Sequence, residues 1–292
     1  ARFRMAKRFR SVRMSNSTNR NMRGGDTSTK ITPSPFISRQ HPLNDPKDPF
    51  TAVKVNKELL DRMALKTFPN QGESSLCGPA TLFYCLLMDY PDIYKQAVAE
   101  LWRDGKTMID DLKIEPSARA KNPKDLFNKK DEKRISAIDW MTLASLRDST
   151  NNIMAYSSPF DQAGGITLPA DIIDWFKKAG YRHVDTFVLD SPTNIIKING
   201  YQNNSNYHVI SLINSGFISR QSLPTVNLPN HWVVWTDQLR NSDGSPIRSD
   251  IKPSDTIKLK LFTWGEIARP IQANLSFAGF QKYHFQAIVI GK

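Results

Sequence analysis

The order of the secondary-structure signals predicts an α+β fold, with helices in the first part of the chain and strands in the second. Apolar residues recur at helical spacing between residues 51 and 180, whereas runs rich in β-branched and aromatic residues dominate from residue 183 onward. Helices and strands that are segregated in this way favour an antiparallel sheet with helices packed beside it over a wound parallel sheet.

The composition supports a folded protein without a membrane span. The chain has 292 residues, of which 39% are hydrophobic, enough for a substantial core in one large domain or two small ones. The longest apolar run, Leu82–Met88, is far shorter than the roughly 20 residues of a membrane-spanning helix. The formal net charge of +12 is uneven, because residues 1–25 carry eight basic side chains and no acidic ones.

Residues 1–45 are predicted to form a basic, flexible arm or linker, and residues 46–292 the folded domain. The arm is rich in Arg, Ser, Asn and Thr and then in Pro, so it buries too little apolar surface to become ordered. A basic arm can contact anionic partners. Without regularly interleaved aromatic residues, however, a nucleic-acid interface is disfavoured. A solvated linker or a tag is the alternative interpretation.

Five helices are predicted before residue 181, from apolar residues at spacings of three and four and from Pro, Gly and Thr near the ends. The expected elements are 51–66, 78–89, 91–104, 135–147 and a helix that Thr167 caps and that ends at Gly180. The charged, Pro-containing residues 106–133 are predicted to form a long surface excursion.

Five strands are predicted in the second part of the chain. The expected ranges are His183–Leu189, Tyr207–Ile213, His231–Asp237, Thr256–Trp264 and Tyr283–Ile290. In the fourth range lysines alternate with leucines, which is typical of a half-buried antiparallel strand. No glycine-rich phosphate-binding motif occurs, so no nucleotide cofactor is expected.

The two cysteines are too few for a disulfide-rich scaffold or a four-cysteine zinc site. On one helix the Cα atoms of Cys77 and Cys85 would lie about 12 Å apart, too far for a disulfide. Cys85 lies within an apolar run and is expected in the core. Cys77 precedes Gly78 and Pro79 at a loop-to-helix junction, where free N–H groups and the helix dipole lower the pKa of a thiol. Gly78 would leave room for a substrate backbone.

A cysteine nucleophile also needs a base, and His231 is the candidate among the five histidines. It stands at the start of a strongly apolar strand, directly after the loop Asn227–Asn230, so a rigid element would hold it at the end of the sheet. A structural histidine is the alternative. The histidines and cysteines show no metal-ligand spacing, and neither a metal nor another cofactor is expected.

The segment Gln71–Ala80, with the sequence QGESSLCGPA, resembles the nucleophile segment of papain-like cysteine peptidases, especially the bacteriocin-processing peptidases that cut after double-glycine leaders. In that branch a glutamine six residues before the nucleophile donates to the oxyanion, which implies this role for Gln71. His231 and the Trp-Val-Val that follows it match the base of the family and its strand. The resemblance implies a papain-like fold over roughly residues 51–290.

The third catalytic position departs from the family pattern. Papain-like enzymes orient the histidine with an Asn or Asp just before a Trp-Gly pair, which Trp264-Gly265 resembles. Alignment on that pair puts Phe262 at the asparagine position, and phenylalanine cannot accept a hydrogen bond. Thr263, Asp237 or a backbone carbonyl remain candidates, as does a Cys–His dyad. Trp264 is expected either to shield the histidine from water or to be a plain core residue.

Three functions remain open at this point. The first is a cysteine endopeptidase that cleaves a protein substrate, with a preference for double-glycine or glycine-rich sites carried over from the resemblance. The second is an amidase or glutamine deamidase that uses the same Cys–His site, because a fold does not decide the reaction. The third is a non-enzymatic binder of nucleic acid or acidic protein through the basic arm.

The chain also resembles papain-like effector domains that bacteria deliver into rivals or hosts through a secretion system. That resemblance implies a hydrolase toxin carried behind a linker, secreted or delivered into the cytoplasm of a target cell. It also implies a cognate immunity protein that protects the producing cell. Gly24-Gly25 in the arm would then be a candidate self-processing site, although the residues before it are basic and lack the apolar pattern of a leader.

Overall fold

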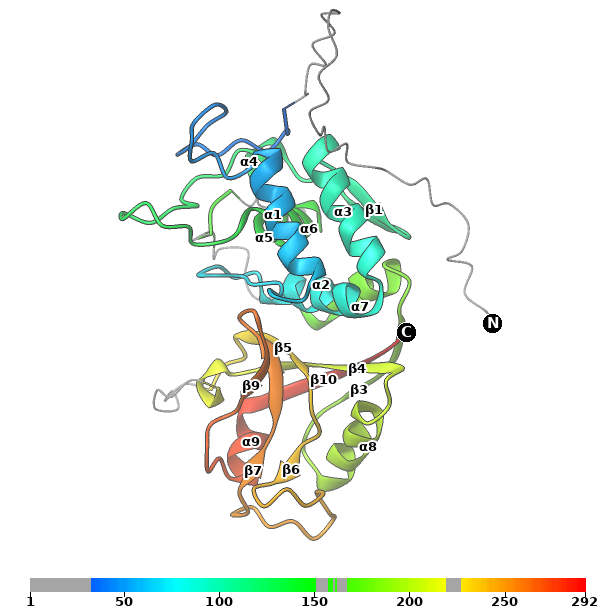
Figure 1. Cartoon of the computed structure of the whole chain (residues 1–292). Helices are drawn as coiled ribbons and strands as arrows, with labels where there is room; N and C mark the ends of the chain where they lie inside the picture. Colours follow the sequence, from blue (N-terminus) through cyan, green and yellow to red (C-terminus); the bar gives the residue numbers. More distant parts are fainter. Residues whose placement is uncertain (1–32, 151–156, 160, 162–166, 219–226) are drawn as a thin grey trace, which may run out of the picture. The chain divides into compact units, whose positions relative to one another are not determined.

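The computed structural model of the chain describes residues 33–150, 157–159, 161, 167–218 and 227–292. They belong to one folded unit, Pro33–Lys292, which is separate from Ala1–Thr32. Helices α1–α7 form the first part of this unit, and an antiparallel sheet with α8 and α9 forms the second (Figure 1). The predicted α+β organisation is confirmed. The basic stretch and Gly24-Gly25 lie outside the described residues.

The folded unit begins earlier than the predicted boundary at residue 46. Phe36 and Ser38 are buried, and the backbone N–H of Ile37 donates to the carbonyl oxygen of Lys121. One large aromatic side chain and backbone hydrogen bonds therefore tie residues 33–45 to the rest of the unit. The expectation that these residues are part of a flexible arm is wrong, because their polar composition does not reveal the buried Phe36 or the hydrogen bonds that these residues make to the folded unit.

The helical part is built around α2 (Cys77–Asp89), which is buried along almost its whole length. The other helical elements are α1 (Ala52–Met63), α3 (Pro91–Asp104), α4 (Ala118–Lys121), α5 (Ala137–Asp139), a π-helical segment Trp140–Ala144, α6 (Ser145–Thr150) and α7 (Pro169–Lys178). The predicted bounds of α2 and α3 hold within one residue, because Pro91 stands at the start of α3 and separates the two helices. Within the described part of the chain, none of the helices has the length and apolarity that crossing a bilayer requires.

Residues 106–133 are packed into the fold and are not a surface excursion. Strands β1 (Thr107–Ile109) and β2 (Leu112–Ile114) form a two-stranded antiparallel sheet in which exposed and buried residues alternate. Ala120 in α4 is also fully buried. The prediction is wrong because the charged side chains of this region are the exposed half of an alternating pattern.

Two of the predicted helices differ in detail. The range 135–147 is not one α-helix, because the π-helical segment interrupts it between α5 and α6. Thr167 does not cap α7. Leu168 is the residue before that helix, and its backbone N–H lies 3.3 Å from Oδ2 of Asp171, while Thr167 is buried.

The six-stranded sheet has the order β3-β10-β4-β5-β8-β9, and every neighbouring pair is antiparallel. Its strands are β3 (Arg182–Phe187), β4 (Tyr207–Ile213), β5 (His231–Trp235), β8 (Lys260–Thr263), β9 (Glu266–Pro270) and β10 (His284–Gly291). Strands β6 (Arg240–Asn241) and β7 (Ile257–Lys258) form a separate pair. The fourth predicted strand is thus divided between β7 and β8. In this part of the chain α8 (Pro192–Gln202), α9 (Phe277–Tyr283), β6 and β9 were not predicted.

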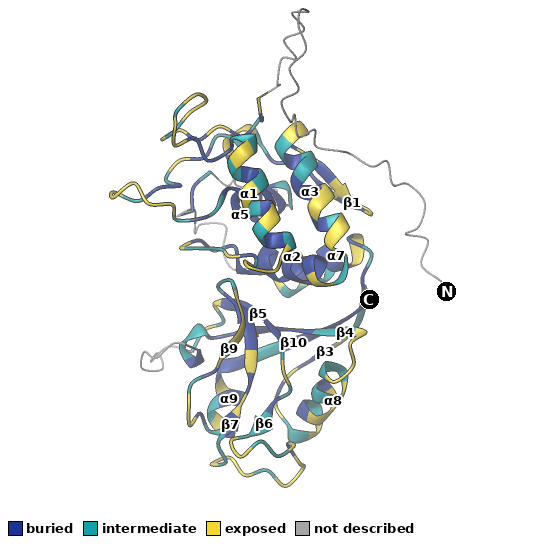
Figure 2. Cartoon of the chain, viewed as in Figure 1, coloured by how far each residue is buried: buried dark blue, intermediate teal, exposed yellow. Residues whose placement is uncertain are grey.

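The sheet separates two hydrophobic clusters, and β5 contributes to both. Trp232 and Val234 pack with the helical part, whereas Val233 and Trp235 pack with the side chains around α8 and α9. Neighbouring side chains of a strand point to opposite faces of a sheet. Figure 2 accordingly shows α2 and much of the central sheet as buried. Two-sided burial explains why β5 is apolar throughout.

Candidate active site

Cys77 is the first residue of α2, at the loop-to-helix junction that the sequence predicted. Both cysteines are free and buried, and Cys85 is fully enclosed in the core. The backbone N–H groups of Trp232, Gly78 and Cys77 itself lie near the Cys77 thiol and favour its thiolate form. The start of α2 therefore meets β5 one residue beyond His231.

Burial raises the pKa of the Cys77 thiol above its ordinary value of 9.0. The three backbone N–H groups and the positive charge of Arg147 act in the opposite direction, but they do not outweigh desolvation. The expectation that the helix start lowers this pKa is therefore wrong for this buried arrangement. Arg147, which is buried in α6, is a charge near the thiol that no spacing in the sequence indicated.

His231 is the first residue of β5 and is only 3% exposed. Its Nε2 atom lies 2.6 Å from Oγ1 of Thr263. Burial lowers the pKa of its imidazole to about 4, so the ring is neutral at neutral pH. Among the residues that the structure describes, no hydrogen bond joins this ring to the Cys77 thiol. The two side chains thus come from adjoining positions but are not engaged with each other.

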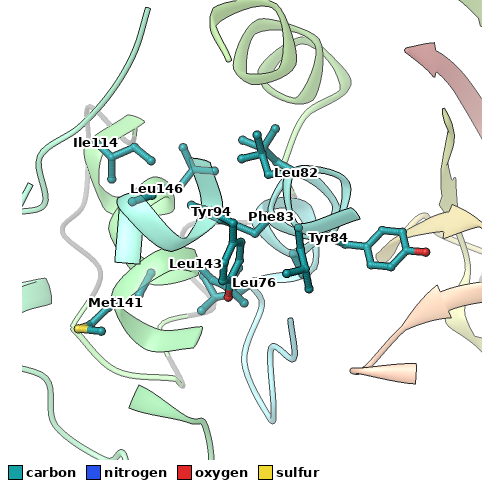
Figure 3. Close-up of a cluster of buried hydrophobic side chains, with 14 of the residues drawn as sticks. Leu76, Leu82, Phe83, Tyr84, Tyr94, Ile114, Met141, Leu143 and Leu146 are labelled. Carbon is teal, nitrogen blue, oxygen red and sulfur yellow. The ribbon is translucent and has the colours of Figure 1, made fainter. Parts of the chain in front are cut away.

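Of the residues considered for orienting His231, Thr263 contacts the ring and Asp237 does not. Asp237 is exposed beyond the end of β5, where its carboxylate accepts a hydrogen bond from the backbone N–H of Gln238. Phe262 stacks on Tyr84 with ring centroids 3.9 Å apart. In Figure 3, Tyr84 projects from α2 away from the other labelled side chains. Phe262, at the position expected for an orienting asparagine, therefore packs in the core. The next residue, Thr263, makes the hydrogen bond to His231.

Trp264 stacks on His231, with ring centroids 4.9 Å apart and planes inclined by 21°. It makes the contact that shielding the histidine requires. Trp264 and Gly265 form the two-residue turn between β8 and β9, and both have positive φ, at 48° and 76°. A Cβ at Gly265 would lie 3.0 Å from Nδ2 of Asn70. The absence of a side chain thus lets this turn approach the loop that precedes Cys77.

Gln71 lies in that loop, but its amide group is already bonded. The Nε2 atom donates to the carbonyl oxygen of Ser74 at 2.9 Å, within a turn that Gln71 itself begins. The turn packs closely against Arg134 and needs glycine at position 72, since a Cβ there would lie 2.0 Å from the carbonyl oxygen of Arg134. The structure therefore commits one of the two amide N–H groups of Gln71 to its own turn and directs the side chain toward Ser74.

Thr167 lies against the start of α2. A Cβ at Gly78 would lie 2.4 Å from Oγ1 of Thr167, so this packing needs glycine at position 78. The indole Nε1 of Trp232 donates to the carbonyl oxygen of Thr167 at 2.8 Å. Thr167 thus occupies the space beside Gly78 that was expected to admit a substrate backbone.

A cleft of about 440 Å³ adjoins the Gln71 turn and the Trp264-Gly265 turn. Asn70, Gly72 and Gly265 are part of its lining, as is the buried ion pair of Arg62 with Asp139. It provides open surface of mixed polarity beside the loop that precedes Cys77. Within the described ranges, no group of three or more His, Cys, Asp or Glu is arranged to hold a metal ion.

Comparisons with known proteins add nothing to this geometry. No family model matches the chain, and no curated protein and no solved structure matches it significantly. What the site does is therefore inferred from its own residues.

Proposed function

We propose that this protein is a papain-like cysteine hydrolase with Cys77 as the nucleophile and His231 as the base. The nearness of the Trp232 backbone N–H to the Cys77 thiol carries the proposal, because it brings the residue directly after His231 to the nucleophile. The order of the parts adds support. The thiol is at the start of a buried helix, the imidazole at the start of a strand, and its hydrogen-bond partner on the next strand.

The neutral resting pair suits a reaction in which His231 removes the thiol proton as Cys77 attacks a carbonyl carbon. The imidazolium would then donate from Nε2 to Oγ1 of Thr263, with Trp264 limiting the access of water to that bond. His231 next protonates the leaving amine. It then acts as the base for the water that hydrolyses the thioester. Backbone N–H groups at the start of α2, and Gln71 once its amide leaves Ser74, would stabilise the oxyanion.

The reaction we propose is endoproteolysis of a protein substrate, with glycine-rich sites preferred. The resemblance of Gln71–Ala80 to the nucleophile segment of double-glycine peptidases supports this choice. Amide hydrolysis or glutamine deamidation would use the same residues, and the experiment below separates these reactions.

We also propose that the protein is an effector toxin that acts in the cytoplasm of a target cell, with an immunity protein that blocks the site in the producing cell. The basic, Ser- and Asn-rich sequence of residues 1–25, ahead of the folded unit, supports a catalytic unit carried behind a linker.

The test is incubation of the protein with a bacterial lysate, followed by mass spectrometry of protein termini and side chains. New termini indicate proteolysis, and conversion of Gln to Glu without new termini indicates deamidation. Cys77→Ala is expected to reduce the reaction at least about 10³-fold, because the nucleophile is removed. Cys85→Ala on the same helix is the matched control and should retain activity. Full activity of Cys77→Ala would contradict the proposal.

A further inference from the structure

The candidate catalytic residues are covered by the protein itself. Cys77 is 6% exposed and His231 is 3% exposed. Attack on a substrate requires the reacting atoms to come within about 3–3.5 Å of each other. A protein substrate cannot reach the thiol in this arrangement, so something must move before the reaction can occur.

Thr167 is the residue that joins the two elements of the site. Its side chain packs on Gly78 at the start of α2, and its carbonyl oxygen accepts the indole hydrogen bond of Trp232 on β5. Thr167 itself is 1% exposed. A single residue therefore covers the backbone beside the nucleophile and is held there from the strand that carries the base.

We propose that Thr167 is an autoinhibitory contact, which keeps Cys77 inaccessible until Thr167 leaves Gly78 and the Trp232 indole gives up its hydrogen bond. This inference rests on the proposed function of Cys77. It adds a mode of regulation to that function, since the resting protein is closed and a substrate or partner binds the open form.

The contact of Thr167 with Gly78 and Trp232 is held weakly enough to open. The hydroxyl of Thr167 is buried and finds no hydrogen-bond partner among the described residues. A buried hydroxyl without a partner destabilises the closed form, and exposure to water removes that penalty. Thr167 packs on Gly78, a residue without a side chain. The Trp232 indole is thus the main directional bond that holds Thr167 in place.

The resting state of the thiol agrees with inhibition. The Cys77 thiol lies near backbone N–H groups, and the imidazole of His231 is bonded to Thr263 and not to the thiol. Withdrawal of Thr167 would open the start of α2 and allow substrate to bring the two side chains together.

The experiment measures how fast iodoacetamide alkylates Cys77, followed by the mass of the intact protein. A Cys85→Ala background leaves Cys77 as the one thiol of the chain. Trp232→Phe removes the indole donor, and Thr167→Gly removes the side chain that covers Gly78. Each is expected to accelerate alkylation about three- to tenfold, the effect of losing one hydrogen bond or contact of ordinary strength. Thr167→Val replaces the unpartnered hydroxyl by a methyl group and should slow alkylation.

Trp235→Phe is the matched control. Trp235 lies on the same strand and also donates an indole hydrogen bond, but to Oγ of Ser211. Its variant should alkylate at the parent rate, measured for all proteins well below their unfolding temperatures. Equal rates in the parent, Trp232→Phe and Thr167→Gly would overturn the proposal. So would equal acceleration by Trp235→Phe, which would indicate general loosening of the core.

The alkylation assay does not depend on catalysis, so the two proposals fail separately. Faster alkylation in Trp232→Phe and Thr167→Gly, without hydrolysis of any protein, would leave the contact standing and overturn the proposed function. Hydrolysis that requires Cys77, with unchanged alkylation in both variants, would overturn the contact alone.

Discussion

The two ends of helix α2 differ in how their polar groups are satisfied. At the C-terminal end, the carboxylate of Asp89 is buried and fully paired. His208 Nε2 and Lys292 Nζ each lie 2.6 Å from it, and the Tyr181 hydroxyl donates to it at 3.0 Å. These partners come from β4, from the residue after β10 and from the residue before β3, so the Asp89 cluster connects the sheet to the helical part.

At the N-terminal end, about 18 Å away along the helix, the polar groups are buried but not fully satisfied. The Cys77 thiol and the His231 imidazole are both neutral, and the Thr167 hydroxyl has no partner within the described ranges. One helix thus carries a saturated polar network at one end and groups available for chemistry at the other. Saturation favours stability, and incomplete pairing is characteristic of functional sites.

The largest expected effect lies at the Asp89 end. Burial by itself would raise the pKa of Asp89, but the hydrogen bonds and charges of His208 and Lys292 hold it below its ordinary value of 3.8. Asp89→Ala leaves the half-buried His208 and Lys292 without a counter-charge and should cost about 3 kcal/mol of unfolding free energy in urea titrations, the lower end of the range for buried pairs. The control is Asp174→Ala, which removes an exposed ion pair with Lys178 and should cost at most about 1 kcal/mol. Equal losses in the two variants would contradict the assigned role of the Asp89 cluster.

The next effect is a loss of stability in acid, which is expected from His231 near the N-terminal end of α2. The imidazole of His231 has a pKa of about 4 in the folded protein against 6.5 in a model peptide. Between these values the unfolded chain binds the proton and the native protein does not, so stability falls as the pH drops from 6.5 toward 4. For His231 the loss is on the order of 3 kcal/mol.

The measurement is the free energy of unfolding between pH 4 and pH 7. His284, whose pKa burial lowers to about 3, contributes in the same window. His231→Gln should therefore reduce the slope without removing it. An unchanged slope would show that His231 is not buried as a neutral ring.

A smaller effect is expected at the hydrogen bond between His231 and Thr263. Hydrogen bonds to charged groups are worth about 1.5–3 kcal/mol, so Thr263→Val should lower kcat roughly 10- to 150-fold by withdrawing the acceptor from the imidazolium. Thr263→Ser keeps the hydroxyl and should restore most of the activity. KM should change little in either variant. Equal activity of the valine and serine variants would show that the Thr263 hydroxyl does not contribute to the reaction.

Much of the fold follows from local pattern. Strand β4 spans the predicted Tyr207–Ile213, because β-branched residues and two-sided burial coincide there. The missed helix α8 carried a usable signal, with Ser191 as its N-cap, Pro192 at its first position and Ile195 and Ile198 buried three residues apart. The packing of residues 33–45 and 106–133 had no comparable signal, since a few apolar side chains within polar segments decide it.

The site could be predicted only in part, because sequence spacing does not give strand register. The positions of Cys77 and His231 follow from a helix start and a strand start. Alignment on Trp264-Gly265 selected Phe262, whereas the observed hydrogen bond belongs to Thr263. The contact of Thr167 with Trp232 joins residues 65 positions apart, and no periodicity of the chain indicates it.

The place of β10 in the sheet has a consequence for the nascent chain. β10 follows every other strand of the sheet in sequence, yet it lies between β3 and β4. Until residues 284–291 have left the ribosome, the facing edges of β3 and β4 remain unpaired, and unpaired edges recruit strands from other chains. Polypeptides that stop short of residue 284 would therefore be lost to aggregation even though they contain Cys77, His231 and Thr263 intact.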